Sequence, residues 1–534
     1  MTKPSGILAN VVPFIIALLV GVMLGSVVQT QLNLAALQSM GVAIPPDVRI
    51  TTTWQDLLSF APLYALLFGV GFVVSQTAAV LLCRRLGGRY PMLLCVGAGI
   101  VGLWVTLWLV NTLAPPPTLV AATRGITGLV AMLATAGVAG AVFAGLRRRT
   151  LSAKRPRGFS GFAVLLAVGS LAAALPGISQ PAQAQDLPYH IETLTDDLVH
   201  PWSLAFLPDG RMLVTERPGR LRLLSDEGET LVESLGGVPA VYASGQAGLF
   251  DVSLSPQFED DQQVYLSYAC GNAEANHTCL AQATLAENSL EDVSEIFRAQ
   301  PAKQGAAHFG GRIAWLSDDT LILTLGDGFD YREQAQNLGN HIGSIVRLNP
   351  DGSVPQDNPF AYHGDVRPEI YSVGHRNVQG LVFDDQHQRL IAHEHGPRGG
   401  DEINIIEAGA NYGWPIATGG LDYTGARVTP FEVYPGTKPP TLEWTPSIAP
   451  SGMALYSGEL FPEWQGDLLV GALVNKEVRR VRLSDDASSA EDVEGLFGEL
   501  DERIRDVRQG PEGAIYLLTD SPEGKLLRVM PEGD

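Results

Sequence analysis

Four long apolar runs near the start of the chain restrict its fold more than any other feature. They cover Ile7–Val28, Leu58–Leu82, Pro91–Leu113 and Thr123–Leu146. Each is long enough to cross a bilayer as a helix, because about 20 apolar residues span the hydrocarbon core. A fifth run, Phe159–Leu175, is shorter. We therefore predict a transmembrane bundle of about five α-helices within residues 1–178.

The charge of the chain divides it into two parts. The 534 residues carry a formal net charge of −21. Before Asp186 there are 12 Lys and Arg residues against two acidic ones, Asp47 and Asp56, so this part carries +10 and the rest carries −31. A strongly acidic C-terminal part argues against nucleic acid as a partner, because binding of phosphates needs a basic surface.

The basic residues of the N-terminal part predict its orientation. They gather in two of the connections between runs, Cys83–Tyr90 and Arg147–Arg157, whereas Gln29–Leu57 and Ala114–Ala122 contain only Arg49. Connections rich in Lys and Arg stay in the cytoplasm. We expect a multi-pass protein of the inner (cytoplasmic) membrane, with its C-terminal domain in the periplasm or outside.

The fifth run has two interpretations. Basic residues before it and the small residues Ala182-Gln183-Ala184 after it resemble a secretory signal with a cleavage site. The alternative, which we favour because signals are normally N-terminal, is an uncleaved helix followed by a linker. Both interpretations export the acidic part. We expect the linker at residues 179–190 and the exported domain at residues 191–534.

The membrane part is predicted to be an anchor with membrane lipid as its partner. No His precedes His190, so a His-ligated haem is excluded there. No acidic residue falls within an apolar run, which leaves no obvious proton relay. A transport role is the alternative that these absences disfavour.

The sequence of the exported part predicts an all-β domain. Segments such as Pro201–Thr215 and Val507–Asp520 pair two apolar runs around a polar turn, and such units recur over about 350 residues. This recurrence favours a β-propeller over a sandwich, but its spacing does not give the number of blades. Cys270 and Cys279 are close in sequence, so we expect a disulfide in an oxidising compartment. A metal pair with His277 is the alternative.

Two residues at the ends of predicted strands suggest acid–base chemistry. His308 comes directly before an apolar run, and Asp327 ends the next one. A His in this place can act as a general base that a carboxylate orients. Each residue also has a structural interpretation, as a hydrogen-bonding His and as a turn Asp.

Cationic residues at other strands suggest an anionic ligand. Arg376 and Asn377 come just before a strand, where they could hold a cofactor or form a salt bridge instead. Arg503 and Arg505 alternate on one predicted strand face. Two cations on one face suit a carboxylate or phosphate ligand, or they neutralise an acidic domain.

A glycine-rich turn suggests a cation site. Gly396-Pro397 and Asp401-Glu402 frame it, and their carbonyl and carboxylate oxygens are ligands that a hard cation prefers. His393 and His395 nearby resemble a metal motif, but they have no evident third ligand.

Taken in order, the motifs of the exported part resemble a known family. They are PWSLAFLPDGRMLVTERPGRL, GQAGLFDVSLSPQF, HFGGRIAW, LTLGDG, GSIVRLNPDG, GHRNVQGLVFD, HEHGPRGGDEINIIEAGANYGWP and RIRDVRQGPEG. The set resembles the soluble quinoprotein aldose sugar dehydrogenases of the glucose/sorbosone dehydrogenase family. The resemblance covers nearly all of Asp186–Asp534 and none of the membrane part. It implies a six-bladed propeller that uses pyrroloquinoline quinone (PQQ) and calcium.

The resemblance implies a catalytic role for three residues. His308 matches the general base that takes the proton of the anomeric hydroxyl of a sugar, while hydride passes to the quinone. Asp327 matches the residue that orients this base. Arg376 matches the arginine beside the reacting quinone oxygen.

The resemblance also implies the ligands of the cofactors. PQQ would contact Gln246, Arg376, Asn377, Arg503 and Arg505. The residues implied for calcium are Gly396 and Pro397 at a PQQ-bound ion, and Glu402 and Tyr412 at a structural ion. The family often places a Lys where this chain has Val474. Lys476, two positions on, would point to the same strand face, and we expect it to replace that Lys.

Two rival functions follow from a propeller with these residues. One is a calcium-dependent lactonase, in which His308 would activate water. The other is a non-catalytic binding propeller, which would not need His308, Asp327 and Arg376 together. The prediction is PQQ- and calcium-dependent oxidation of aldoses to lactones. Electrons would leave to a separate carrier or quinone, because the chain has no Cys-x-x-Cys-His haem motif.

Overall fold

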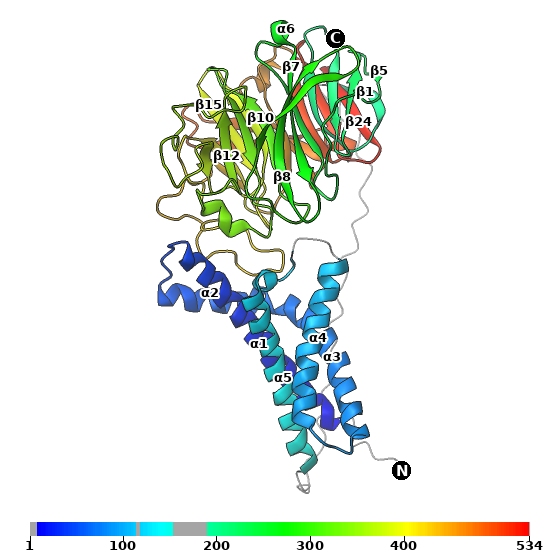
Figure 1. Ribbon diagram of the computed structural model, residues 1–534, viewed down its shortest axis with the longest axis vertical. Helices are drawn as coiled ribbons and strands as arrows, with labels where there is room; N and C mark the ends of the chain where they lie inside the picture. The colour runs from blue at the N-terminus through cyan, green and yellow to red at the C-terminus, as the bar shows by residue number, and fades with distance from the viewer. Residues whose placement is uncertain (1–7, 114–117, 153–188, 533–534) are drawn as a thin grey trace.

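The computed structural model describes residues 8–113, 118–152 and 189–532, which form a helical part below a large β-domain (Figure 1). The helices of the first part are α1 (Leu8–Ser39), α2 (Pro46–Ser59), α3 (Ala61–Arg85), α4 (Pro91–Leu113), the 3₁₀ helix η1 (Ala121–Arg124) and α5 (Ile126–Ser152). Four of them, α1, α3, α4 and α5, are long and apolar enough to cross a membrane. The fifth predicted run, Phe159–Leu175, lies outside the described residues.

Helix α2 was not expected from the sequence. It begins in the predicted connection Gln29–Leu57, runs two residues into the predicted span Leu58–Leu82, and crosses the end of the bundle that faces the β-domain (Figure 1). It begins with Pro at its first position, which suits the fixed φ of Pro. Thr52 and Asp56 are buried on one of its faces. The helix is amphipathic and too polar to span a membrane.

The β-domain is a propeller of six four-stranded antiparallel blades. The first three blades are β2 (Pro201–Phe206), β3 (Met212–Glu216), β4 (Arg220–Leu224) and β5 (Thr230–Val232); β6 (Leu249–Leu254), β7 (Gln263–Gly271), β8 (Asn276–Leu285) and β9 (Leu290–Arg298); and β10 (Gly310–Trp315), β11 (Leu321–Leu325), β12 (Ser344–Leu348) and β13 (Ile370–Val373). The six-bladed fold implied by the resemblance is thus confirmed.

The other three blades complete the ring. They are β14 (Val378–Asp384), β15 (Arg389–Glu394), β16 (Asp401–Ile406) and β17 (Leu442–Trp444); β18 (Pro450–Leu455), β19 (Leu468–Ala472), β20 (Glu477–Leu483) and β21 (Ala490–Leu496); and β22 (Ile504–Gln509), β23 (Ile515–Thr519), β24 (Gly524–Pro531) and β1 (Tyr189–Leu198). Short helices α6 (Phe258–Asp261), η2 (Arg332–Gln336), η3 (Pro462–Trp464) and η4 (Gly498–Leu500) lie in the connections.

The first strand of the domain closes the ring by pairing with the last. β1 runs antiparallel to β24, with Tyr189 opposite Pro531 and Leu198 opposite Gly524. This pairing joins the two ends of the domain, so the sixth blade cannot form without both. β1 begins at Tyr189, two residues before the predicted start of the domain at residue 191.

The predicted disulfide is confirmed. Cys270 on β7 is bonded to Cys279 on β8, across a hairpin in which Tyr268 pairs with Cys279. Cys83 and Cys95 of the helical part are buried and form no disulfide.

The helical part contacts the propeller through α1, α2 and the connection that contains η1. Asp56 of α2 accepts a hydrogen bond from the backbone N–H of Arg427 (2.9 Å), and the Nδ2 of Asn33 donates to the Arg427 carbonyl (3.1 Å). Leu34, Leu37 and Val42 pack against Ile416. These contacts place the helical part at the face of the propeller where the candidate site lies.

Candidate functional site

The candidate catalytic pair lies where two neighbouring strands meet at one end of a blade. His308 comes just before β10 and Asp327 just after β11, and the two strands pair with Gly310 opposite Leu325. This pairing brings His308 Nδ1 to 2.6 Å from Asp327 Oδ1, and both side chains are buried. The sequence-based prediction that Asp327 orients His308 has this contact as its support.

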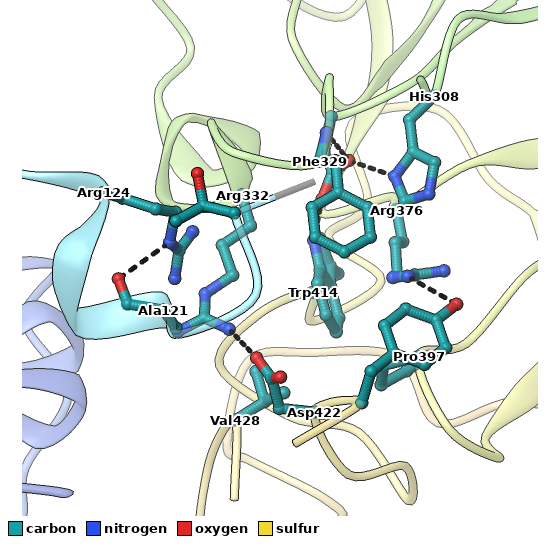
Figure 2. Close-up of a pocket in the computed structure, with 13 residues that line it drawn as sticks. Ala121, Arg124, His308, Phe329, Arg332, Arg376, Pro397, Trp414, Asp422 and Val428 are labelled. Carbon is teal, nitrogen blue, oxygen red and sulfur yellow. Dashed lines mark hydrogen bonds and ion pairs between the residues drawn. The ribbon is translucent and has the colours of Figure 1, made fainter. Parts of the chain in front are cut away.

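Asp327 is held by further hydrogen bonds. Its Oδ1 accepts the N–H of Phe329 (2.7 Å), and its Oδ2 accepts the indole N–H of Trp414 (2.8 Å). The backbone N–H of His308 donates to Gln246 Oε1 (2.8 Å), and the ring of Phe329 packs on the imidazole with centroids 4.9 Å apart. These contacts fix the imidazole relative to the pocket (Figure 2).

The electrostatics favour a neutral His308 beside an anionic Asp327. Burial, followed by the charge of Arg376, lowers the pKa of His308. Burial by itself would raise the pKa of Asp327, but His308 and Arg376 outweigh it and keep this pKa below its usual range. With a carboxylate accepting at Nδ1, the Nε2 of a neutral imidazole is free to take a proton.

Arg376 lies beside this pair and is held by backbone oxygens. Its guanidinium donates to the carbonyls of His395 (3.0 Å) and Gly396. The guanidinium also lies over the ring of Trp414, with Arg376 Cζ 5.3 Å from the ring centroid. Neighbouring Asn377 accepts the N–H of Gly310 (3.2 Å). Arg376 is therefore a buried cation at the edge of the pocket that contains His308.

A cavity of about 170 Å³ contains most of the predicted PQQ contacts. Its lining includes Gln246, Asn377, Arg503 and Arg505. Arg217 adds a further cation, and Trp202, Phe250 and Phe309 add aromatic walls. Asp520 lies between Arg503 and Arg505 at 2.8 and 3.1 Å, so one acid faces three cations. This combination of flat walls and excess positive charge fits a planar tricarboxylate.

Lys476 does not fit the role predicted for it. It lies in the turn between β19 and β20 rather than on a strand, so the argument from a shared strand face was wrong. Its ammonium is half-exposed and pairs with Asp501 at 2.9 Å. It is absent from the residues that line the cavity, whereas Leu473 from the same connection is among them.

The predicted calcium ligands lie in two places. The Gly396 carbonyl accepts a bond from Arg376, so a cation there would share this oxygen with the guanidinium. Pro397 lines the pocket that contains His308. Glu402, by contrast, lies in a cluster of carboxylates with Glu394 and Glu443, and burial followed by the charge of Glu394 raises its pKa well above the usual range. A cation bound there would relieve this repulsion.

Tyr412 connects to the same cluster through His375. The ring of Tyr412 stacks on His375 with centroids 4.8 Å apart, and His375 Nδ1 lies 2.8 Å from Glu394. The hydroxyl of Tyr412 is used within the fold, because it donates to the Ile405 carbonyl (2.6 Å). Only the backbone carbonyl of Tyr412 would then serve a cation.

The alternation of His393 and His395 does not form a metal site. His395 Nε2 lies 2.7 Å from the Pro450 carbonyl, and burial lowers the pKa of His393 to about 3. Across the ranges that the structure describes, the only group of three His, Cys, Asp or Glu ligands close enough for a metal is Cys270, Cys279 and Glu295, in which the cysteines form the disulfide.

Sequence analysis missed several residues of the site. Trp414 was quoted within a motif but given no role, and its cis bond to Pro415 is not visible in the sequence. Lys303 lies over the ring of Phe309 at 3.3 Å, and burial lowers its pKa to about 7. Asp520 pairs with both arginines. Trp414 carries no local signal for this role, because it reaches Asp327 from a distant segment.

Two further hollows adjoin His308. One of about 640 Å³ is lined by Tyr242, Gln304 and Tyr423 with His308 and Phe329. The other, of about 20 Å³, is lined by Asp327, Arg376 and Asp422 among others, and also by Thr118, Ala121 and Arg124 of the helical part. In Figure 2, Ala121 and Arg124 lie on the side of this pocket opposite His308.

Comparisons with known proteins agree with this site. Residues 198–528 match the family described as Glucose / Sorbosone dehydrogenase. The aldose sugar dehydrogenase YliI of Escherichia coli is 41% identical over 348 residues, which cover 64% of this chain and 93% of that one. The crystal structure of the soluble Escherichia coli aldose sugar dehydrogenase in its apo form superimposes with a TM-score of 0.62, at 41% identity, and covers 64% of this chain and 100% of that one.

A PQQ-bound relative has also been solved. The aldose sugar dehydrogenase of Streptomyces coelicolor in its PQQ-bound form is 30% identical, with a TM-score of 0.53, and covers 64% of this chain and 98% of that one. The family match begins at residue 198, so the helical part lies outside it. The match over residues 198–528 shows that the chain belongs to the glucose/sorbosone dehydrogenase family.

Proposed function

We propose that this protein is a membrane-bound, PQQ- and calcium-dependent aldose dehydrogenase. The observation that carries the proposal is the buried His308–Asp327 pair at 2.6 Å, beside a cavity with Arg217, Arg503 and Arg505. The names of the relatives support it, because one is an aldose sugar dehydrogenase and another was solved with PQQ.

In this proposal His308 is the general base. Its Nε2 removes the proton of the anomeric hydroxyl, while Asp327 holds Nδ1–H and stabilises the imidazolium that forms. PQQ, when bound, would supply the two-electron acceptor for the hydride of the same carbon, so the aldose would leave as its lactone. Arg376 supplies a positive charge beside the reacting centre.

The residues proposed to hold PQQ are Gln246, Asn377, Arg503 and Arg505, together with Arg376. Calcium is proposed at Gly396–Pro397 and at the carboxylate cluster of Glu402 near Tyr412. We also propose that the helices place residues 1–178 in the inner membrane, that residues 179–190 link them to the propeller, and that the propeller faces the periplasm. Electrons then pass to a separate acceptor.

The test uses the full chain in detergent. After treatment with a chelator, we expect no dye reduction with any aldose, and recovery when calcium and PQQ are added together. His308→Ala should lower kcat by about 10²–10⁴-fold, which is the usual contribution of a general base. His387→Ala is the matched control, because this exposed His pairs only with Asp384 on an outer turn.

Two outcomes would contradict the proposal. Sugar oxidation by protein free of PQQ and calcium would exclude the cofactor chemistry. Lactone hydrolysis that depends on His308 without PQQ binding would instead identify a lactonase.

A further inference from the structure

The helical part reaches into the candidate site through the connection between α4 and α5. Thr118, Ala121 and Arg124 line the same small hollow as His308 and Arg376. Figure 2 shows η1 approaching the pocket from the side opposite His308. Anchoring in a membrane does not require such a contact, because the apolar helices alone would hold the protein in the bilayer.

This connection is bound to one loop of the propeller. Arg124 NH2 lies 3.4 Å from Glu333 Oε1, and Arg124 NH1 donates to the Asp330 carbonyl (3.4 Å). The backbone N–H and hydroxyl of Thr118 donate to the Asp330 carboxylate, at 3.3 and 3.1 Å. The side chain of Arg124 is only 14% exposed, so water screens its ion pair poorly.

The loop that is held in this way follows the catalytic Asp327 directly. It carries Phe329, whose ring packs on His308 with centroids 4.9 Å apart and stacks on Tyr423 at 6.0 Å. Arg332 of the same loop donates to Asn33 of α1 (3.2 Å) and lies 3.5 Å from Asp422. The helical part therefore contacts, at both Arg124 and Asn33, the loop that shapes the wall beside the base.

We propose that the helical part forms one wall of the sugar pocket, and that Arg124 is a positioning residue for aldose binding. It keeps the loop from Phe329 to Glu333 against His308 and closes the pocket on this side. Sugar then enters through the wider hollow lined by Tyr242, Gln304 and Tyr423. Among the described residues, none of the helical part lines the cavity with Gln246, Asn377, Arg503 and Arg505, so we expect the affinity for PQQ to be unchanged when Arg124 is replaced. This inference rests on the proposed function.

The test compares variants of the full chain in lipid nanodiscs. Arg124→Gln should raise the KM for aldoses by about 10-fold, the equivalent of one partly buried ion pair, with kcat nearly unchanged. Arg124→Lys should recover part of this loss, because a Lys keeps the charge that faces Glu333. The affinity for PQQ, measured by titration of the calcium-loaded protein, should stay at the wild-type value in both variants.

Two further variants separate positioning from general damage. Thr118→Val removes the hydroxyl donor to Asp330 without removing a charge, and it should also raise the KM. Arg124→Gln with Glu333→Gln should raise the KM by less than the combined effect of the two single variants, because Arg124 and Glu333 are coupled, while Glu333 also pairs with Arg332 at 3.0 Å. Arg49→Gln is the matched control, because Arg49 is bonded to Gln31 and Gln38 within the helical part.

Three results would overturn the inference. An unchanged KM in Arg124→Gln would exclude a positioning role while leaving the proposed function intact. A parallel loss of PQQ affinity or of kcat, without recovery by Lys, would assign Arg124 to general stability. A wild-type protein that loads PQQ but oxidises no aldose would refute the proposed function and this inference with it.

Discussion

At the residue scale, the site depends on one buried imidazole whose charge state is set by its surroundings. His308 has a carboxylate on one nitrogen and Arg376 nearby, within an interior that penalises charge. The carboxylate of Asp327 stabilises the protonated imidazole. Burial and the guanidinium of Arg376 disfavour that form, and together they have the larger effect, so the pKa of His308 is lowered. A base of this kind is ready to accept a proton at neutral pH.

This balance predicts the pH dependence of catalysis. Burial and Arg376 lower the pKa of His308 below its ordinary value of 6.5, so the fraction of free base falls only below that pH. We expect kcat/KM for an aldose to be independent of pH near 7 and to decline through an apparent pKa below 6.5. A profile with its acid limb at or above 6.5 would contradict the assignment of His308 as the titrating base.

The bond from Trp414 to Asp327 gives a second prediction. Trp414→Phe keeps the ring but removes the N–H that donates to Asp327 Oδ2, so the carboxylate becomes less well oriented. Hydrogen bonds to charged groups contribute about 1.5–3 kcal/mol, so we expect kcat to fall by about 10-fold or more. Trp315→Phe is the matched control, because Trp315 donates its indole N–H to Ser253 (3.0 Å) at the end of β10 opposite His308, and its loss should leave kcat unchanged.

At the element scale, the strands were more predictable than the connections. His308 and Asp327 could be paired from the sequence because they flank two adjacent strands, and antiparallel neighbours bring such ends together. The pairing of Cys270 with Cys279 was predictable for a similar reason, because the two residues lie on the adjacent strands of one hairpin. Lys476 could not be placed, because whether a residue belongs to a strand or to its turn depends on where the ladder ends, and here β19 ends at Ala472.

Helix α2 carries an element-scale prediction. Ile50, Trp54 and Leu58 follow a spacing of four residues and are 71%, 64% and 65% exposed, opposite the face that Asp56 buries. A helical face of this kind at the end of a membrane bundle is expected to lie in the lipid interface, where Trp is favoured.

Quenching by lipids with brominated chains tests the placement of α2. Trp54→Phe should remove part of the quenching that the wild-type protein shows in such bilayers. Trp315→Phe should not, because Trp315 is bonded to Ser253 within the propeller. Equal quenching of wild type and Trp54→Phe would place α2 away from lipid.

At the scale of the whole molecule, the two parts are arranged as the charges predict. The propeller lies at the end of the bundle that carries α2 and η1, and the connection between α3 and α4 with its arginines lies at the other end (Figure 1). The positive-inside rule keeps arginine-rich connections in the cytoplasm. The propeller is therefore expected on the opposite side of the membrane.

Labelling of single cysteines in intact cells tests this orientation. In a background with Cys83→Ser and Cys95→Ser, Val433→Cys on the propeller should react with a membrane-impermeant maleimide, because Val433 is 62% exposed. Leu86→Cys, in the connection between α3 and α4, should react only after lysis. The reverse pattern would place the propeller in the cytoplasm.

The sequence by itself determined the apolar helices that are long enough to span a membrane, the all-β domain and the family. Apolar length, strand periodicity and the order of motifs are properties of neighbouring residues, so they can be read without a structure. The tertiary structure alone decided which distant residues meet. Trp414 reaches Asp327 across 87 positions, and Arg124 approaches Glu333 from another part of the molecule. Such contacts depend on how blades close and parts pack, and no local pattern encodes them.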